Sequence, residues 1–225
     1  MSIFGTLAEK PWINPSALSH GPDAAAIPYA AADTALRFII AVVSVLFFLF
    51  IITFLARSQY PDFQALAGQP WAPFTDTSRL WFNTAWLALS SLAMQWAVFS
   101  AQRQRLVGLT VGLGLATTFS IVFLLAQFSL WQQLNALGFY VGNNPANSYF
   151  YLLTAVHGLH LLGGLIALAS MGARLWQRET AAAMAVPLGL CARYWHFLLI
   201  VWLVVFALLT SESSTINALA AMCGF

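Results

Sequence analysis

The segment 148–168, which reads SYFYLLTAVHGLHLLGGLIAL, decides the class of fold. It carries no formal charge over the roughly 20 residues that a helix needs to cross the hydrocarbon core of a bilayer. A helix places His157 and His160, three positions apart, on one face, and costly polar groups at membrane depth usually face protein. Small residues let a second helix approach closely, and here they are Gly158, Gly163 and Gly164. We therefore expect an inner helix of a membrane bundle.

The composition places the whole chain in the membrane class. Hydrophobic residues make up 60% of the chain and charged residues 7%, far from the balance of a soluble domain. A net charge of +2 without a Lys/Arg cluster indicates no nucleic-acid partner. The chain also lacks the Cys-x-x-Cys-His motif of covalent haem attachment. Its two cysteines, Cys191 and Cys223, are expected near opposite membrane faces, so no disulfide between them is expected.

The hydropathy pattern predicts an all-α integral membrane bundle of five transmembrane helices. The transmembrane domain covers 35–210, and its expected spans are 35–55, 80–99, 106–127, 149–171 and 191–209. A polar, Pro- and Ala-rich N-terminal tail, 1–34, precedes it and lacks the basic and apolar regions of a signal peptide. A short polar tail, 211–225, follows it.

Basic residues predict the orientation of the bundle. Arg103 and Arg105 follow the second span, and Arg174 and Arg178 follow the fourth, with Arg193 close behind. The loop after the first span carries balanced charge, and the loop after the third span carries none. By the positive-inside rule the N-terminus is cytoplasmic and the C-terminus lies outside, as an odd number of spans requires.

Five polar residues are expected inside the bundle in structural roles: His157, His160, His196, Asn83 and Gln95. The second span also contains Ser90 and Ser91, and its polar face is expected to pack on protein. Gly108 and Gly112 form a small-xxx-small pair in the third span, which is a helix-packing motif.

The three membrane histidines raise the alternative of a metal site, because imidazole is a common ligand. No Asp or Glu lies in any predicted span to complete a carboxylate-bridged site. From the inner ends of their spans, His196 lies roughly 7 Å deep and His160 roughly 16 Å deep, which disfavours a shared site. We expect each histidine to hydrogen-bond a neighbouring helix, and we predict no catalytic, cofactor-binding or metal residue in this chain.

Three arginines at span ends, Arg37, Arg79 and Arg193, are candidates for contacts with lipid headgroups. Alternatively, these arginines set only the orientation of the spans. One arginine can also serve both roles.

Three sequence blocks together resemble a known family. They are Phe150–Leu165 with its HGLH and paired glycines, Tyr194–Leu203 reading YWHFLLIVWL, and Trp81–Ala85 running on to Ser90 and Ser91. In this order and spacing they resemble subunit III of the haem-copper oxidases, which are cytochrome c and quinol oxidases. The resemblance covers roughly 35–210.

The resemblance implies a non-catalytic subunit of an oxygen-reducing, proton-translocating complex of aerobic respiration. Its partners would be the catalytic subunit I, which holds haem and copper, and subunit II. This chain would hold no cofactor of its own. It would stabilise the catalytic subunit, bind phospholipid and support proton uptake. The typical subunit III has seven spans, so this chain resembles a shortened, five-helix bacterial form. The resemblance therefore implies a location in the cytoplasmic (inner) membrane of a bacterium.

Two departures from the family pattern concern proton handling. Val45 stands where the family has a membrane glutamate, and Leu199 stands where the last block has an aspartate. Neither side chain can titrate, so the buried part of the subunit is expected to act by packing and lipid retention.

Two alternative functions stay open. The nearer one is an accessory membrane subunit of nitric oxide reductase, which belongs to the same superfamily. The other is a small transporter or channel, but the sequence shows no internal repeat, no pair of broken helices and no membrane carboxylate for a coupling ion.

Overall fold

The computed structural model describes residues 26–66, 78–177 and 180–225, with side chains from Tyr29 onward. In this part of the chain the secondary structure consists of six α-helices, without a β-strand. They are α2 (Ala26–Ser58), α3 (Ser78–Gln102), α4 (Leu106–Ala136), α5 (Pro145–Trp176), α6 (Ala181–Leu209) and α7 (Ser213–Met222).

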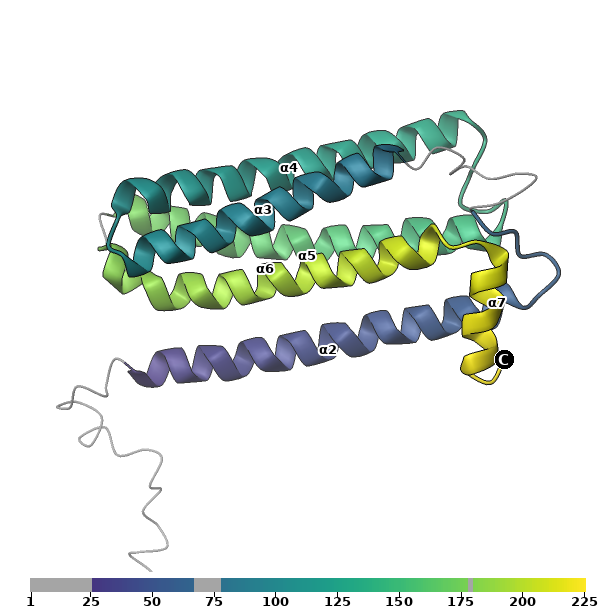
Figure 1. Cartoon of the computed structure of the whole chain (residues 1–225), viewed down its shortest axis with the longest axis horizontal. Helices are drawn as coiled ribbons and strands as arrows, with labels where there is room; N and C mark the ends of the chain where they lie inside the picture. Colours follow the sequence, from purple (N-terminus) through teal and green to yellow (C-terminus); the bar gives the residue numbers. More distant parts are fainter. Residues whose placement is uncertain (1–25, 67–77, 178–179) are drawn as a thin grey trace, which may run out of the picture.

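Helices α3 to α6 form a bundle of four long, roughly parallel rods, and α2 runs along one side of it (Figure 1). The most extensive contact is between α3 and α4, followed by that between α3 and α6. Helix α2 contacts α5 and α6, and the short α7 crosses the end of α2. The sequential helices α3, α4, α5 and α6 alternate in direction, because each is joined to the next by a short connection.

The all-α prediction is confirmed, and four helices are long and apolar enough to cross a membrane. They are Tyr29–Ser58, Leu106–Ala136, Pro145–Trp176 and Ala181–Leu209. The fifth long helix, α3, has 25 residues and is the least apolar of the five. At 1.5 Å per residue it is about 37 Å long, longer than the roughly 30 Å of a hydrocarbon core.

The helices extend beyond the ranges that hydropathy suggested. Residues 26–34 belong to α2, although the sequence placed them in the polar tail, and α6 begins at Ala181 and contains Pro187, which was expected in a loop. Alanine-rich stretches favour helix, whereas Pro187 lies inside α6, beyond its first turn, where it removes one backbone hydrogen bond. Most of the predicted C-terminal tail forms α7. The rest of the N-terminal tail, 1–25, and Arg178 lie outside the described residues.

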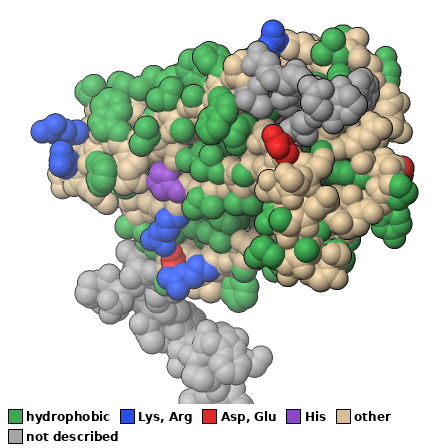
Figure 2. Space-filling model, turned by 45° about the vertical axis from the view of Figure 1, so that its right-hand side comes forward, with side chains coloured by type: hydrophobic (Ala, Val, Ile, Leu, Met, Phe, Trp, Pro, Cys, Tyr) green, Lys and Arg blue, Asp and Glu red, His purple; other side chains and the backbone are tan. Residues whose placement is uncertain are grey.

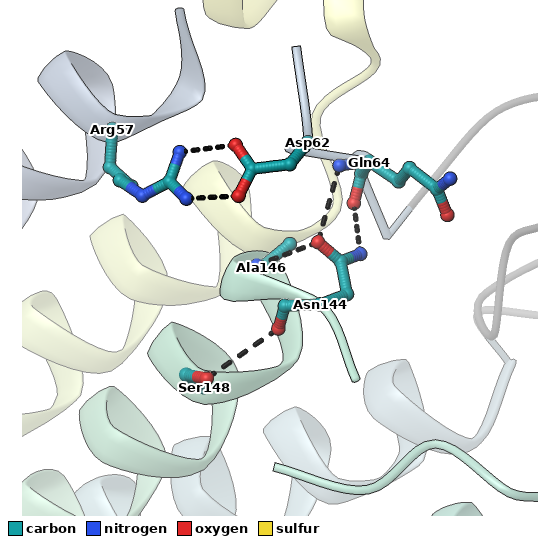
Figure 3. A network of polar contacts seen from close by, with 6 residues as sticks. All are labelled: Arg57, Asp62, Gln64, Asn144, Ala146 and Ser148. Atoms are coloured by element: carbon teal, nitrogen blue, oxygen red, sulfur yellow. Dashed lines mark hydrogen bonds and ion pairs between the residues drawn. The ribbon is translucent and has the colours of Figure 1, made fainter. Parts of the chain in front are cut away.

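A polar network joins the loop after α2 to the start of α5 (Figure 3). The Asn144 side chain caps α5 by accepting from the Ala146 N–H at 3.1 Å, and it also bonds both the N–H and the C=O of Gln64. Beside it, Arg57 of α2 forms an ion pair with Asp62. The hydrogen bond from Arg57 holds the pKa of the Asp62 carboxyl below its usual range. These contacts anchor α2 at one end only.

Close approach of α3 and α4 depends on glycine. A Cβ built on Gly112 would lie 2.9 Å from both the backbone N and the Cβ of Ala97, and one on Gly108 would lie 2.6 Å from Ser100 Oγ. The Ser100 hydroxyl can rotate away, but the Ala97 backbone is fixed within α3. Gly112 therefore sets the distance between the two helices.

We expect Gly112→Ala to force α3 and α4 apart and to destabilise the bundle by about 1–3 kcal/mol, as overpacking does. The matched control is Gly114→Ala on the same helix, since a Cβ there meets nothing within 4 Å. Thermal unfolding in mild detergent, followed by tryptophan fluorescence, measures both variants. Equal melting temperatures for the two variants would contradict this account of the helix pair.

Candidate functional site

Helix α3 buries most of its small polar side chains, and large apolar side chains cover much of its exposed face. Asn83, Thr84, Ser90 and Ser91 are buried, and the exposed positions include the large hydrophobic residues Trp81, Phe82, Leu89, Leu92, Trp96 and Phe99. This pattern is the reverse of that in a soluble helix. It is what a bilayer requires, because lipid offers polar groups no hydrogen bonds.

The inward polar face of α3 bonds to two buried indoles of α6. Trp195 Nε1–H donates to Ser90 Oγ at 2.8 Å, and Trp202 Nε1–H donates to Thr84 Oγ1 at 3.0 Å. Ser90 Oγ also lies 2.7 Å from the Ser120 hydroxyl of α4. Ser90 therefore links three helices at one buried point.

His157 is fully buried on α5, and it joins α5 to α6. Its Nε2–H donates to the backbone carbonyl of Leu198 at 3.1 Å. Its ring contacts those of Trp202 and Phe123, at centroid distances of 5.0 and 5.9 Å, and these two rings also contact each other at 4.8 Å. Its Nδ1 has no hydrogen-bond partner among the described residues. These contacts make His157 part of the packed interior.

The other two membrane histidines occupy separate surroundings. His160 donates from Nδ1 to the Val156 carbonyl of its own helix at 2.8 Å, and its ring lies 5.8 Å from that of Phe47 on α2. His196 of α6 lies between two side chains of α3, with Nδ1 2.5 Å from Ser91 Oγ and Nε2 2.9 Å from Gln95 Oε1.

Asn83 and Gln127 form a further buried polar pair, since Asn83 Nδ2 lies 3.3 Å from Gln127 Oε1. Over the described residues, no group of three or more His, Cys, Asp and Glu lies close enough to hold a metal ion.

The three candidate lipid-binding arginines have partners within the chain. Arg37 of α2 pairs with Asp33 at 2.6 Å, and Arg193 of α6 pairs with the same carboxylate. This shared ion pair links α2 to α6. Arg79, at the other end of the bundle, donates to Gln133 Oε1 of α4.

A cavity of about 650 Å³ lies between α2 and the pair α5 and α6. Its lining is mostly apolar and includes Leu36 and Ile39 of α2 and Leu190 of α6, with Arg174 as a cationic side chain. Gly163 faces this space, and a Cβ there would meet nothing within 4 Å. The cavity is therefore bounded by three helices at the end where α2 diverges from the bundle (Figure 1).

The remaining glycines of α5 make different contacts. A Cβ on Gly164 would lie 2.8 Å from Trp195 Cζ3, whereas one on Gly158 would make an ordinary contact of 3.7 Å with Leu124. Gly164 therefore makes room for the buried indole of α6.

The sequence reasoning did not identify Thr84, Ser120 or Gln127 as bonding partners. Trp195 and Trp202 were the available signal, because a buried indole N–H usually finds an acceptor. Which acceptor each indole reaches depends on the relative rotation of two helices.

Comparison with known proteins agrees with this arrangement. The family profile described as cytochrome c oxidase subunit III matches residues 24–212, which include α3 to α6. The chain belongs to this family of oxidase subunits. Its apolar helices and its family membership make it a multi-pass membrane protein.

Relatives of this subunit III are found in several bacteria. The chain is 33% identical over 163 residues to the probable cytochrome c oxidase subunit 3 of Mycobacterium leprae, covering 72% of this chain and 77% of the relative. It is 32% identical over 153 residues to the corresponding protein of Mycobacterium tuberculosis, covering 67% and 75%. It is also 30% identical over 124 residues to the cytochrome bo(3) ubiquinol oxidase subunit 3 of Pseudomonas aeruginosa, covering 55% and 59%.

We expect Ser90→Ala to destabilise this subunit III by about 1–3 kcal/mol, because it leaves the buried Trp195 indole N–H without its acceptor. The control is Ser44→Ala on α2, whose exposed hydroxyl bonds only to the Ile40 carbonyl of its own helix. Thermal unfolding in detergent measures both. If the two variants melt together, the link between α3 and α6 does not depend on this hydrogen bond.

Proposed function

We propose that this chain is the non-catalytic subunit III of a haem-copper terminal oxidase in a bacterial inner membrane. In this role it packs beside the haem- and copper-bearing subunit I, in a complex that includes subunit II. The observation that carries the proposal is the family match over 24–212, on a bundle in which two buried indoles of α6 bond to hydroxyls of α3. Such an interior supports packing and stability, and the described residues gather no metal-ligating group.

We propose that α3 crosses the membrane as the fifth span. It is less apolar than the other long helices because it contains polar residues, but Asn83, Ser90 and Ser91 are buried, and large aromatic and aliphatic side chains cover much of its exposed face. Its length also suffices for crossing. The five-span domain then corresponds to helices α2 to α6, flanked by the two tails.

The distribution of charge supports an orientation with the N-terminus in the cytoplasm. Arg103 and Arg105 at the α3–α4 turn lie at the same end of the bundle as Arg174 near the end of α5 (Figure 1). In the space-filling view most of the Lys and Arg surface lies toward one end, and hydrophobic surface covers much of the rest (Figure 2). At the opposite end Arg57 is paired with Asp62. The positive-inside rule assigns the basic end to the cytoplasm.

The cavity between α2, α5 and α6 is suited to holding phospholipid. Its lining accepts acyl chains, and Arg174 together with the Arg37–Asp33–Arg193 cluster supplies cationic groups at the basic end. Arginine binds phosphate through paired N–H donors. Lipid in this space would fill the gap between α2 and the bundle. Arg79 lies at the other end and would contact the opposite leaflet.

In this proposal the membrane-embedded part of the subunit does not itself transfer protons, because it lacks the two carboxylates of the family pattern. Val45 is 58% exposed on the outer side of α2, and Leu199 is half-buried on α6, where the family carries carboxylates. The contribution to proton uptake would then come through stabilising the catalytic subunit and its lipids.

Purification in mild detergent tests the function. We expect the chain to travel with a haem-containing subunit that reduces oxygen, and to bind no stoichiometric haem or copper when isolated. A partner that reduces nitric oxide in place of oxygen would identify the nitric oxide reductase accessory. A chain that runs alone and moves a solute across vesicles would identify a transporter.

We expect His157→Leu to lower assembly and stability of the complex, since it leaves the Leu198 carbonyl without the imidazole that joins α5 to α6. The expected cost is roughly 1–3 kcal/mol. His160→Leu is the comparison and should cost less, because its imidazole bonds within its own helix. The pH profile of oxygen reduction should stay in place in both variants. An assembled variant with a shifted profile would place that histidine in a proton route.

A further inference from the structure

A partly exposed polar cluster lies on the outer surface where α3 meets α6. We call this surface the α3–α6 seam and define it by Ala88, Leu92 and Gln95 of α3 and His196 and Leu203 of α6. Leu92 is 67% exposed and Leu203 is 42% exposed, while Gln95 and His196 are half-buried. The seam therefore brings an amide and an imidazole to a surface that is otherwise apolar.

The hydrogen bonds of His196 determine which polar groups of the seam remain without a hydrogen-bond partner. Gln95 Oε1 can only accept, so His196 Nε2 carries the proton and donates to it at 2.9 Å. The Ser91 hydroxyl then donates to His196 Nδ1, 2.5 Å away. The imidazole is thereby satisfied on both nitrogens. The Gln95 amide nitrogen keeps two N–H donors, and no acceptor for them lies among the described residues.

Gln95 differs in this respect from the outward-facing hydroxyl groups of the other long helices. Thr53 of α2, Thr110 of α4 and Ser170 of α5 each bond back to a carbonyl of their own helix. Such groups can face acyl chains without an external partner. A side-chain amide N–H at membrane depth is strongly stabilised by an external acceptor, because each unsatisfied group there costs several kcal/mol.

The depth of Gln95 excludes lipid oxygens as its usual acceptors. Gln95 lies seven residues before the end of α3 at Gln102, about 10 Å along the helix axis. Centring the roughly 37 Å helix in a 30 Å core leaves Gln95 on the order of 7 Å inside the hydrocarbon. Lipid ester and phosphate oxygens lie at the boundary. This depth favours an acceptor that comes from protein.

The shape of the seam admits a helix. Ala88 is small, and small residues on a membrane helix let a neighbour approach closely. Helices α3 and α6 run side by side, and no other described helix is drawn across them along the middle of the bundle (Figure 1). Helix α2 makes its contacts with the long helices of the bundle mainly through α6 and α5.

We propose that the α3–α6 seam is the surface on which a transmembrane helix of the catalytic subunit docks, with an acceptor oxygen opposite the Gln95 amide. This assignment rests on the proposed function and names the face that it uses. The partner helix is apolar apart from that acceptor, which a Ser, Thr, Asn or Gln side chain or a helix carbonyl freed by proline can supply.

Site-specific photo-crosslinking in the intact complex tests the assignment. A photoreactive residue replaces Leu92 on the seam or, as the matched control, Val42 on α2, since both side chains are 67% exposed. We expect Leu92 to form an adduct with the haem-bearing subunit, and Val42 to give none with it. Adducts from Val42 alone, or none from Leu92 in a complex that contains that subunit, overturn the assignment. Purification without any haem-bearing subunit contradicts the proposed function itself.

A second measurement compares Leu92→Trp with Val42→Trp. The bulky seam residue is expected to lower the recovery of the haem-bearing subunit about tenfold, the factor that 1.4 kcal/mol represents. The control should leave recovery unchanged. Thermal unfolding of each purified chain establishes that both variants fold. Equal recovery from two folded variants would place the docking surface elsewhere on the bundle.

Discussion

The hydrogen bonds from the Trp195 and Trp202 indoles of α6 to Ser90 and Thr84 of α3 are the contacts on which the bundle depends. Hydrophobic burial does not drive association between spans in a bilayer, because acyl chains are as apolar as the side chains they replace. Packing and hydrogen bonds must hold the helices together. This explains why the most polar long helix makes the most extensive helix contacts, with α4 and α6.

Close packing follows from the same constraint. Without a solvent-driven force, dispersion contacts contribute only where backbones and side chains lie within van der Waals distance. Gly112 allows α4 to approach the backbone of Ala97, and Gly164 allows the Trp195 ring to lie against α5. The indole that bonds to Ser90 is thus also the one that fills the space above Gly164. Hydrogen bonding and packing act through the same side chain.

Helix α2 is held in a different way. At its C-terminal end Phe54 packs against Phe63 and Tyr149, and the Asn144 network holds the following loop. Farther along the helix Phe47 contacts the His160 ring of α5. Toward the other end, Asp33 links Arg37 to Arg193 across the cavity that α2 forms with α5 and α6. The separation leaves room for lipid at the basic end while the polar network keeps α2 attached.

The sequence by itself determined the membrane class, the helical fold and the family, because hydropathy and the local blocks around His157 and Trp195 are properties of single segments. It also indicated that the polar face of 80–99 packs on protein, and Asn83, Ser90 and Ser91 are buried. Helix ends were missed because helices continue beyond the apolar core. Only the tertiary structure decided that the three histidines have separate partners, that Arg37 and Arg193 share Asp33, and that Gln95 faces outward beside His196. Those facts depend on the rotation and offset of each helix against its neighbours, which many distant contacts set together.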